Sequence, residues 1–333
     1  MTDGTLVTNP LKRGWEWLAV EPHQRIGVRI LQVAIGLMLL FRVLTECRFY
    51  LYLWGPNGIG TGHTSRILGD TLGGVLDQLF QSGAGTLAIL LLLAVSAALL
   101  VFGRWTRLAT LFALITFVSI EQRLPQLPDG GDNIARIVLV YMLFLLPPRA
   151  NVKPGSLRVW FHNLAVLAIA TQLIILYTTS GFMKAFGDKW HHGVAMYYVS
   201  QVEWFSLPAL RQMFMRPLIV TLSTYIPMFY QLLFGVAILS PLKVPWLLVG
   251  ICFHLGVASF MGLVSFSTAM IGLECFLISD AEYRRMAKLV GRLYEQILCF
   301  TQGFTRRPPV SARPQPVYLI QSEIESPRSL DSR

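Results

Sequence analysis

The sequence predicts an all-α fold, a polytopic membrane helix bundle. Hydrophobic residues make up 54% of the 333-residue chain and charged residues only 14%, whereas charged residues account for about 25% of an ordinary soluble domain. The apolar residues are also clustered, and residues 87–102 contain no charged side chain. In hydrocarbon, backbone N–H and C=O groups must be paired within the segment, so long apolar runs become helices. The lipid bilayer is therefore the first partner that we expect.

We expect about eight membrane segments, because each apolar run approaches the length of a helical span. Their approximate ranges are 26–45, 87–103, 106–120, 133–147, 163–183, 218–239, 246–261 and 263–278. The first follows a polar start without a cleavage pattern, so it is expected to stay in the membrane. Arg29 and Arg42 lie near its ends, where long cationic side chains reach the interface.

The later segments each have a distinguishing feature. The second and third meet at the corner Gly103-Arg104, and the fourth is short for a full span and carries Arg136. The fifth and sixth are long apolar runs. Only Gly262 separates the seventh from the eighth, so the last pair forms either two spans or a re-entrant turn.

Lysine and arginine residues are distributed unequally between the two sides of this bundle. They are concentrated in the N-terminal segment, in the loops after the second, fourth and sixth segments, and near the C-terminus. Because cytoplasmic loops are enriched in Lys and Arg, we expect a multi-pass protein of the cell membrane with both termini in the cytoplasm. The same loops explain the net charge of +10, so no nucleic-acid partner is expected.

The chain divides into four regions. Residues 1–25 form a cytoplasmic N-terminal segment, and residues 26–280 form the transmembrane domain. In residues 281–300, apolar and basic side chains recur at helical spacing, which predicts an amphipathic helix on the inner membrane surface. Residues 301–333 are rich in Pro, Ser and Arg and are expected to form a disordered cytoplasmic tail.

The densest group of candidate catalytic side chains lies where the fifth segment reaches the outer side. It contains Lys184, Trp190, His191 and His192. A Lys or Trp at such a boundary commonly anchors a helix at the interface, whereas a partly desolvated Lys would act as a general base. The sequence alone leaves both interpretations open. No metal is expected, because adjacent histidines point in different directions and no carboxylate lies at ligand spacing.

Other polar side chains lie at membrane depth. His254 lies within an apolar run and either bonds a backbone carbonyl or faces the same cavity as Lys184. Gln172, Glu274 and Arg136 either form hydrogen bonds between helices or line a polar cavity.

The stretch from Gln172 to Lys184 has the pattern Q-x-I-I-x-Y-x-x-x-G-x-x-K. Further along the chain, the residues that complete the pattern are Trp190, Gly193, Phe253, His254, Phe266 and Ser267. Together these stretches resemble the transmembrane part of vitamin K-dependent γ-glutamyl carboxylase and the bacterial proteins grouped with it as the HTTM family. The resemblance covers about residues 20–280.

The resemblance implies that Lys184 is the base that deprotonates a reduced vitamin K or a similar reduced lipoquinone, with His254 beside it. The residues implied to support the site are Gln172, Tyr177, Trp190, Gly193, Asn133 and Asp132. The last two are included because a histidine important to the carboxylase falls near Asn133. The domain that grips the carboxylase propeptide has no counterpart in this sequence, which argues against carboxylation itself.

Some short bacterial members of this family resemble the membrane protein needed to mature a secreted sporulation-delaying peptide toxin. We therefore expect a carboxylase-like, peptide-modifying enzyme that acts on a small secreted precursor peptide of the antimicrobial or toxin type. The alternative is a non-enzymatic membrane export, scaffold or immunity protein, whose polar residues only pack helices together.

Overall fold

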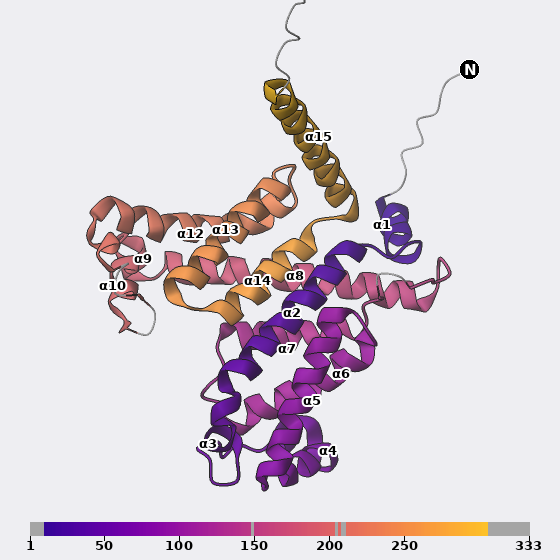
Figure 1. Cartoon of the computed structure of the whole chain (residues 1–333), viewed down its shortest axis with the longest axis vertical. Helices are drawn as coiled ribbons and strands as arrows, with labels where there is room; N and C mark the ends of the chain where they lie inside the picture. The colour runs from indigo at the N-terminus through magenta and orange to yellow at the C-terminus, as the bar shows by residue number, and fades with distance from the viewer. Residues whose placement is uncertain (1–9, 148–149, 204–205, 208–210, 306–333) are drawn as a thin grey trace, which may run out of the picture. The chain divides into compact units, whose positions relative to one another are not determined.

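The computed structural model describes residues 10–147, 150–203, 206–207 and 211–305, and all regular elements within these ranges are helices (Figure 1). The α-helices are α1 (Pro10–Ala19), α2 (Arg25–Glu46), α3 (Tyr50–Trp54), α4 (Ser65–Phe80), α5 (Gly83–Phe102), α6 (Thr106–Arg123), α7 (Gly130–Met142), α8 (Leu157–Ala185), α9 (Asp188–His191), α10 (Ala195–Gln201), α12 (Pro217–Ile238), α13 (Lys243–Met261), α14 (Val264–Leu277) and α15 (Asp280–Thr305). The all-helical prediction is confirmed for these residues.

Several of these helices are long and apolar enough to cross a membrane. Within the described residues there are five such spans, which include α2 continued to Trp54, α5, α8, α12 and α13. A sixth is counted if α14 and α15, which are bent by 95° at their junction, are taken as one span. Each of the eight expected segments corresponds to a helix, but α7 has only 13 residues. The number eight therefore stays a prediction.

Helix α2 lies between α5 on one side and α14 on the other (Figure 1). Small residues allow these close approaches. A Cβ atom added at Gly27 of α2 would lie 2.6 Å from the carbonyl oxygen of Phe276, and one added at Gly272 of α14 would lie 2.3 Å from the Cβ of Ala34. Glycine and alanine are the residues that let membrane helices pack backbone against backbone, so this contact joins the N-terminal and C-terminal parts of the bundle.

The N-terminal segment contains a helix, α1, that sequence analysis did not identify. The connection from α1 to α2 is tied to α8 by Asn163, whose Nδ2 donates to the carbonyl oxygens of Trp17, Leu18 and Glu21 at 3.1, 2.9 and 2.8 Å. The neighbouring His162 is also satisfied at both nitrogens, since Nδ1 accepts from the Leu146 N–H at 3.0 Å and Nε2 lies 2.7 Å from the His23 carbonyl oxygen. These hydrogen bonds attach the N-terminal end of α8 to the α1–α2 connection and to Leu146.

Arg29 and Arg42 both bind partners within the bundle, and Arg42 does not reach the interface as expected. Arg29 donates to the carbonyl oxygens of Leu100 and Val101 at the end of α5, where unpaired helix carbonyls attract a cation. Arg42 is only 7% exposed and forms ion pairs with Asp132 and, at 3.2 Å, with Glu46. Helices α6 and α7 cover Arg42. This side chain is therefore buried with a carboxylate partner instead of being exposed to lipid headgroups.

Arg136 extends the same set of charges. Its Nη1 lies 3.7 Å from Oε2 of Glu121, and its Nη2 donates to the Asn133 side chain at 2.7 Å. Asp132 also accepts from the Asp129 backbone N–H at 2.9 Å in a capping box at the start of α7. We call the five ionisable residues the Arg42 network: Arg42, Glu46, Glu121, Asp132 and Arg136.

Helix α15 covers the region predicted as an amphipathic helix at residues 281–300 and continues to Thr305. Its basic and apolar residues follow helical spacing as predicted. The predicted disordered tail, residues 301–333, is wrong for its first five residues, because residues 301–305 continue α15. Residues 306–333 lie outside the described residues.

Candidate functional site

A cavity of about 610 Å³ lies among α8, α10, α12, α13 and α14. Most of its wall is apolar or aromatic, with contributions from Ile226, Val257, Phe260, Met261 and Phe266. The polar residues on the wall include Lys184, Ser180, Tyr177, Gln231 and His254. Cavities of this size with apolar walls and a few polar groups are typical of small-molecule sites.

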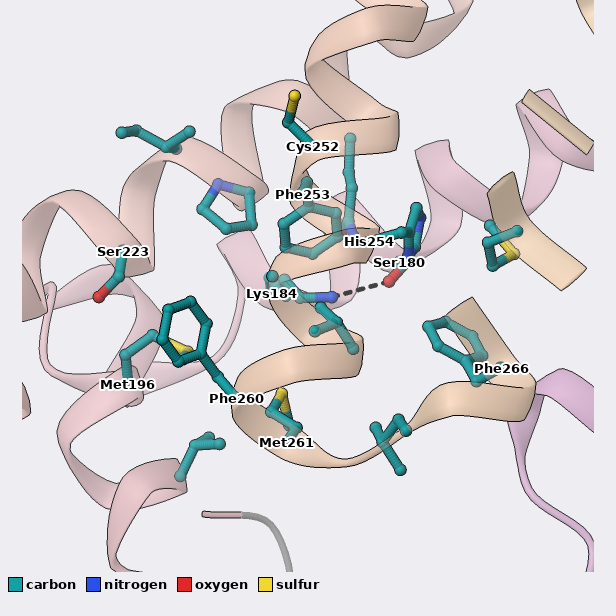
Figure 2. Close-up of a pocket in the computed structure, with 18 of the residues that line it drawn as sticks. Ser180, Lys184, Met196, Ser223, Cys252, Phe253, His254, Phe260, Met261 and Phe266 are labelled. Atoms are coloured by element: carbon teal, nitrogen blue, oxygen red, sulfur yellow. Dashed lines mark hydrogen bonds between the residues drawn. The ribbon is translucent and has the colours of Figure 1, made fainter. Parts of the chain in front are cut away.

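Lys184 lies on the cavity face of α8. Tyr177, Ser180 and Lys184 are spaced three and four residues apart, so they share one face of the helix. The Lys184 amine donates to Oγ of Ser180 at 2.8 Å and lies 5.2 Å from the centre of the Trp190 ring. Figure 2 shows the amine directed toward Ser180, with Phe253, Phe260 and Phe266 around it. The chain turns after α8 through Gly187 into α9, which returns Trp190 to the lysine.

A second group of polar side chains meets beside the cavity. The hydroxyl of Tyr177 lies 2.7 Å from Nε2 of His254 and donates to Oε1 of Glu274 at 2.5 Å, and Tyr230 donates to the same oxygen at 3.0 Å. The four residues come from α8, α12, α13 and α14, and all are buried. We call them the Glu274 network: Tyr177, Tyr230, His254 and Glu274.

Gly250 makes room for this network on α13. A Cβ atom added there would lie 2.0 Å from the Tyr230 hydroxyl oxygen and 2.2 Å from Oε1 of Glu274. One turn earlier, the ring of Trp246 stacks on Tyr230, with centroids 5.4 Å apart and planes 11° apart. One turn later comes His254. The face of α13 is therefore shaped so that a hydroxyl and a carboxylate can approach its backbone.

Two buried polar atoms on residues of the cavity wall have no hydrogen-bond partner: Nδ1 of His254 and Oε1 of Gln231. Buried polar groups in folded proteins are almost always bonded to protein, water or ligand. These two atoms therefore mark places where a bound molecule or an ordered water would form hydrogen bonds.

Of the eight candidate catalytic and supporting residues, the structure brings four together at the cavity: Lys184, Tyr177, Trp190 and His254. Gln172 does not lie on its wall, because five residues on a helix rotate its side chain by about 140° from Tyr177. Gly193 shapes the loop instead. It has a φ of +71°, and an added Cβ would lie 2.9 Å from the Tyr225 ring.

Asp132 and Asn133 also lie away from the cavity wall. Asp132 is paired with Arg42, and Asn133 is exposed and accepts from Arg136. The structure therefore does not bring them together with Lys184 on the cavity wall, and their supporting role stays a prediction. The physical reason is that the first turn of α7 uses its polar side chains for its own cap and for the Arg42 network.

Sequence analysis missed three residues of the site: Ser180, Gln231 and Tyr230. Ser180 had a signal that could have been used, because it lies one turn before Lys184 on the same helix. Gln231 and Tyr230 lie in an apolar run on α12, and which face of that helix meets α8 becomes clear only in the fold. Glu274 was recognised as a buried polar residue, but not as the partner of Tyr177.

The chain is similar to a protein of Bacillus subtilis (strain 168) described as "Uncharacterized protein YitO", with 26% identity over 167 residues. The similar region covers 44% of this chain and 52% of the relative, so the chain spans about half the length of the curated relative that it matches. No protein-family model and no solved structure matches the chain. The similarity identifies a relative but assigns no chemistry.

Proposed function

We propose that this chain is a membrane enzyme of the HTTM type that modifies or matures a small secreted peptide, with Lys184 as its general base. The observation that carries the proposal is the position of the Lys184 amine. Lys184 is half-buried on the wall of an apolar cavity, and its amine lies beside a hydroxyl and an aromatic ring. An interfacial anchor needs none of these contacts.

The surroundings of Lys184 suit an amine that accepts a proton. Within the described residues, no carboxylate forms an ion pair with it, so a neutral amine leaves no buried negative charge behind. The lone pair of neutral Nζ would take a proton from the substrate, and the resulting ammonium would be stabilised by Oγ of Ser180 and by the face of Trp190.

A reduced lipoquinone or vitamin K fits the residues of the cavity. The volume of about 610 Å³ lies within the range of about 300–1,000 Å³ found for small-molecule sites. Phe253, Phe260 and Phe266 would pack on a ring, and the partner-free atoms of His254 and Gln231 would accept hydrogen bonds from hydroxyl groups. When bound, such a group would supply the reducing equivalents that amino-acid side chains lack.

We further propose that the bundle has about eight spans, with both termini in the cytoplasm and the Lys184 end of α8 facing outward. Positive charge concentrated in alternate loops supports this orientation. Single cysteines at Lys189 and Ser311, each in a cysteine-free background, would be labelled with an impermeant maleimide on intact cells. Labelling is expected at position 189 and not at 311, and the reverse pattern would reject the orientation.

The test of function compares Lys184→Arg and Lys184→Ala with the wild type. Secreted peptides from cells with and without the gene would first be compared by mass spectrometry to find the product. Both variants should abolish the product while leaving membrane levels unchanged, because guanidinium keeps the charge but does not deprotonate in the working pH range.

Lys189→Arg is the matched control. Lys189 lies five residues away and outside the main cavity, with its amine 3.9 Å from the centre of the Tyr198 ring, so the product should persist. Full product formation by Lys184→Arg would reject the base and favour the non-enzymatic alternative, an export, scaffold or immunity protein.

A further inference from the structure

His254, Tyr177 and Glu274 form a chain of two short hydrogen bonds. The Tyr177 hydroxyl lies 2.7 Å from Nε2 of His254 and 2.5 Å from Oε1 of Glu274. A tyrosine hydroxyl has one proton to donate, so one of the two bonds must be donated by a partner. With a neutral imidazole, and with any proton of Glu274 placed on Oε1, the chain therefore has two consistent arrangements of its protons.

In the first arrangement Glu274 is ionised. Its Oε1 accepts from Tyr177 and also from Tyr230, while His254 carries its proton on Nε2 and donates to Tyr177. In the second arrangement Glu274 carries a proton and donates to Tyr177, Tyr177 donates to Nε2, and His254 carries its proton on Nδ1. The same heavy-atom positions are compatible with both arrangements, which differ in the tautomer of the imidazole, in the direction of the two hydrogen bonds and in the proton on Glu274.

We propose that His254, Tyr177 and Glu274 form a proton relay that takes one proton from the cavity and holds it on Glu274. A proton from the cavity binds Nδ1 of His254, the Nε2–H bond breaks, and that proton passes to the Tyr177 oxygen. The former hydroxyl proton of Tyr177 moves to Oε1 of Glu274. One proton enters and one is bound, Tyr177 is regenerated, and no other bond changes.

The surroundings of Glu274 favour this exchange. Its side chain is fully buried. Nε2 of His254 lies 3.8 Å from its Oε1, and within the described residues no lysine or arginine forms an ion pair with it. A buried carboxylate without a cation is costly, so proton uptake relieves that cost. The titratable side chains that face it are Tyr177, Tyr230 and His254. Helices α2 and α7 also pack on α14, where Gly27 lies against Phe276 and Gly131 lies against Phe266.

The receiving atom is Nδ1 of His254, and His162 provides the contrast. Both rings are buried, but both nitrogens of His162 are bonded to backbone groups, as expected of a histidine that only holds helices together. His254 uses one nitrogen and leaves Nδ1 without a partner on a residue of the cavity wall. A relay needs a free atom on the side from which the proton comes.

The relay rests on the proposed function only for the source of its proton, so its test requires no activity. The full-length protein would be labelled with ¹⁵N-histidine and reconstituted in lipid nanodiscs. Solid-state NMR would follow the tautomer of His254, assigned by loss of its signals in His254→Gln. Infrared spectroscopy would follow the carboxyl band of Glu274, assigned with Glu274→Gln. We expect His254 to change from the Nε2–H to the Nδ1–H form as Glu274 takes up its proton, while His162 keeps one tautomer.

Tyr177→Phe separates a relay from a merely structural contact, because it keeps the ring and removes the connecting hydroxyl. Glu274 should still titrate in this variant, but the tautomer of His254 should no longer follow it. Tyr225→Phe is the control, since that hydroxyl donates to the His191 carbonyl at 2.6 Å, and the coupling should persist. If Tyr177→Phe does not fold, Glu274→Gln carries the comparison, because its His254 should keep one tautomer at every pH.

Three results would overturn the relay: a His254 tautomer that stays fixed while Glu274 titrates, a doubly protonated His254, or a coupled change that survives in Tyr177→Phe. Lys184→Ala distinguishes failure of the relay from failure of the proposed function. It should leave the coupling intact whether or not Lys184 is the base.

Discussion

The two parts of the bundle each bury a polar network, and the two networks differ in composition. The Arg42 network, between α2, α6 and α7, places two arginines against three carboxylates. The Glu274 network, between α8, α12, α13 and α14, contains one carboxylate, two tyrosine hydroxyls and an imidazole, and no lysine or arginine. The second borders the cavity, whereas no residue of the first lies on its wall.

The difference separates two uses of buried polarity. Opposite charges in contact hold helices in one arrangement, because moving either partner leaves a charge without compensation. A chain of hydroxyl and imidazole groups has no such fixed polarity, and its protons can be redistributed while the packing stays the same. The comparison predicts that the Arg42 network is more important for stability and the Glu274 network for chemistry.

The largest effect is expected from Arg42→Met. It removes the guanidinium and leaves Asp132 and Glu46 buried without it, which should destabilise the protein by about 3–5 kcal/mol. The measurement is thermal unfolding of the purified protein in detergent, together with the folded yield from membranes. Arg48→Met is the control, because Arg48 is exposed and should be nearly neutral. Equal effects of the two changes would contradict the structural role of the Arg42 network.

Gly250→Ala should have the next largest effect. Its methyl carbon would lie within 2.0 Å of the Tyr230 oxygen and 2.2 Å of Oε1 of Glu274, so the network must shift, at a cost of about 1–3 kcal/mol. Gly256→Ala is matched to it on the same helix, with Phe260 as its nearest neighbour at 3.7 Å. Thermal unfolding should distinguish the two variants. Identical midpoints would show that the Tyr230 and Glu274 side chains move aside more easily than these close contacts indicate.

Tyr230→Phe should be milder. It removes one of two hydroxyl donors to Glu274 and keeps the stacking on Trp246, so the expected loss is about 0.5–1.5 kcal/mol. Tyr52→Phe, at an exposed position, serves as the control in the same unfolding assay. A loss as large as that of Arg42→Met would erase the distinction between the two networks.

The smallest effect concerns a carboxylate outside the membrane-crossing helices. Burial raises the pKa of Asp77, but its hydrogen bonds from the backbone N–H groups of Thr64, at 2.8 Å, and Ser65, at 3.4 Å, outweigh burial and hold the pKa below its ordinary value. A lowered pKa gives stability that is present above the unfolded-state pKa of about 4 and is lost as the pH falls through the folded-state value. Asp77→Asn should therefore cost about 0.3–1 kcal/mol at neutral pH.

The check on Asp77 is the difference in unfolding midpoint between Asp77→Asn and the wild type, measured from neutral to acidic pH. The difference should shrink below about pH 4. A difference that is constant with pH would mean that the shape of the side chain matters rather than its charge.

The sequence predicted the helices well because apolar runs in hydrocarbon have few alternatives. It failed for α1 and α4, which are short or mixed in composition and form where tertiary contacts select them. For the site, the chain order placed Tyr177 and Lys184 on one face of α8, since helical spacing is local information. It could not show that Tyr230 and Gly250 would meet Glu274, because that contact depends on how α12, α13 and α14 pack. Arg42 was misjudged for the same reason, since one of its two carboxylate partners, Asp132, lies on α7.

Helix α8 also connects the chemistry to the thickness of the bilayer. Asn163 ties one end to the α1–α2 connection, and Lys184 lies 21 residues later, a distance of roughly 30 Å at the rise of an α-helix. That distance is about the thickness of the hydrocarbon core. A membrane thinner than this produces hydrophobic mismatch, which a helix of this length would relieve by tilting. Lys184 lies in the last turn of α8, so a change in the tilt of this helix would change the depth and hydration of its amine. The lipid chain length of the host membrane would thereby affect the amine.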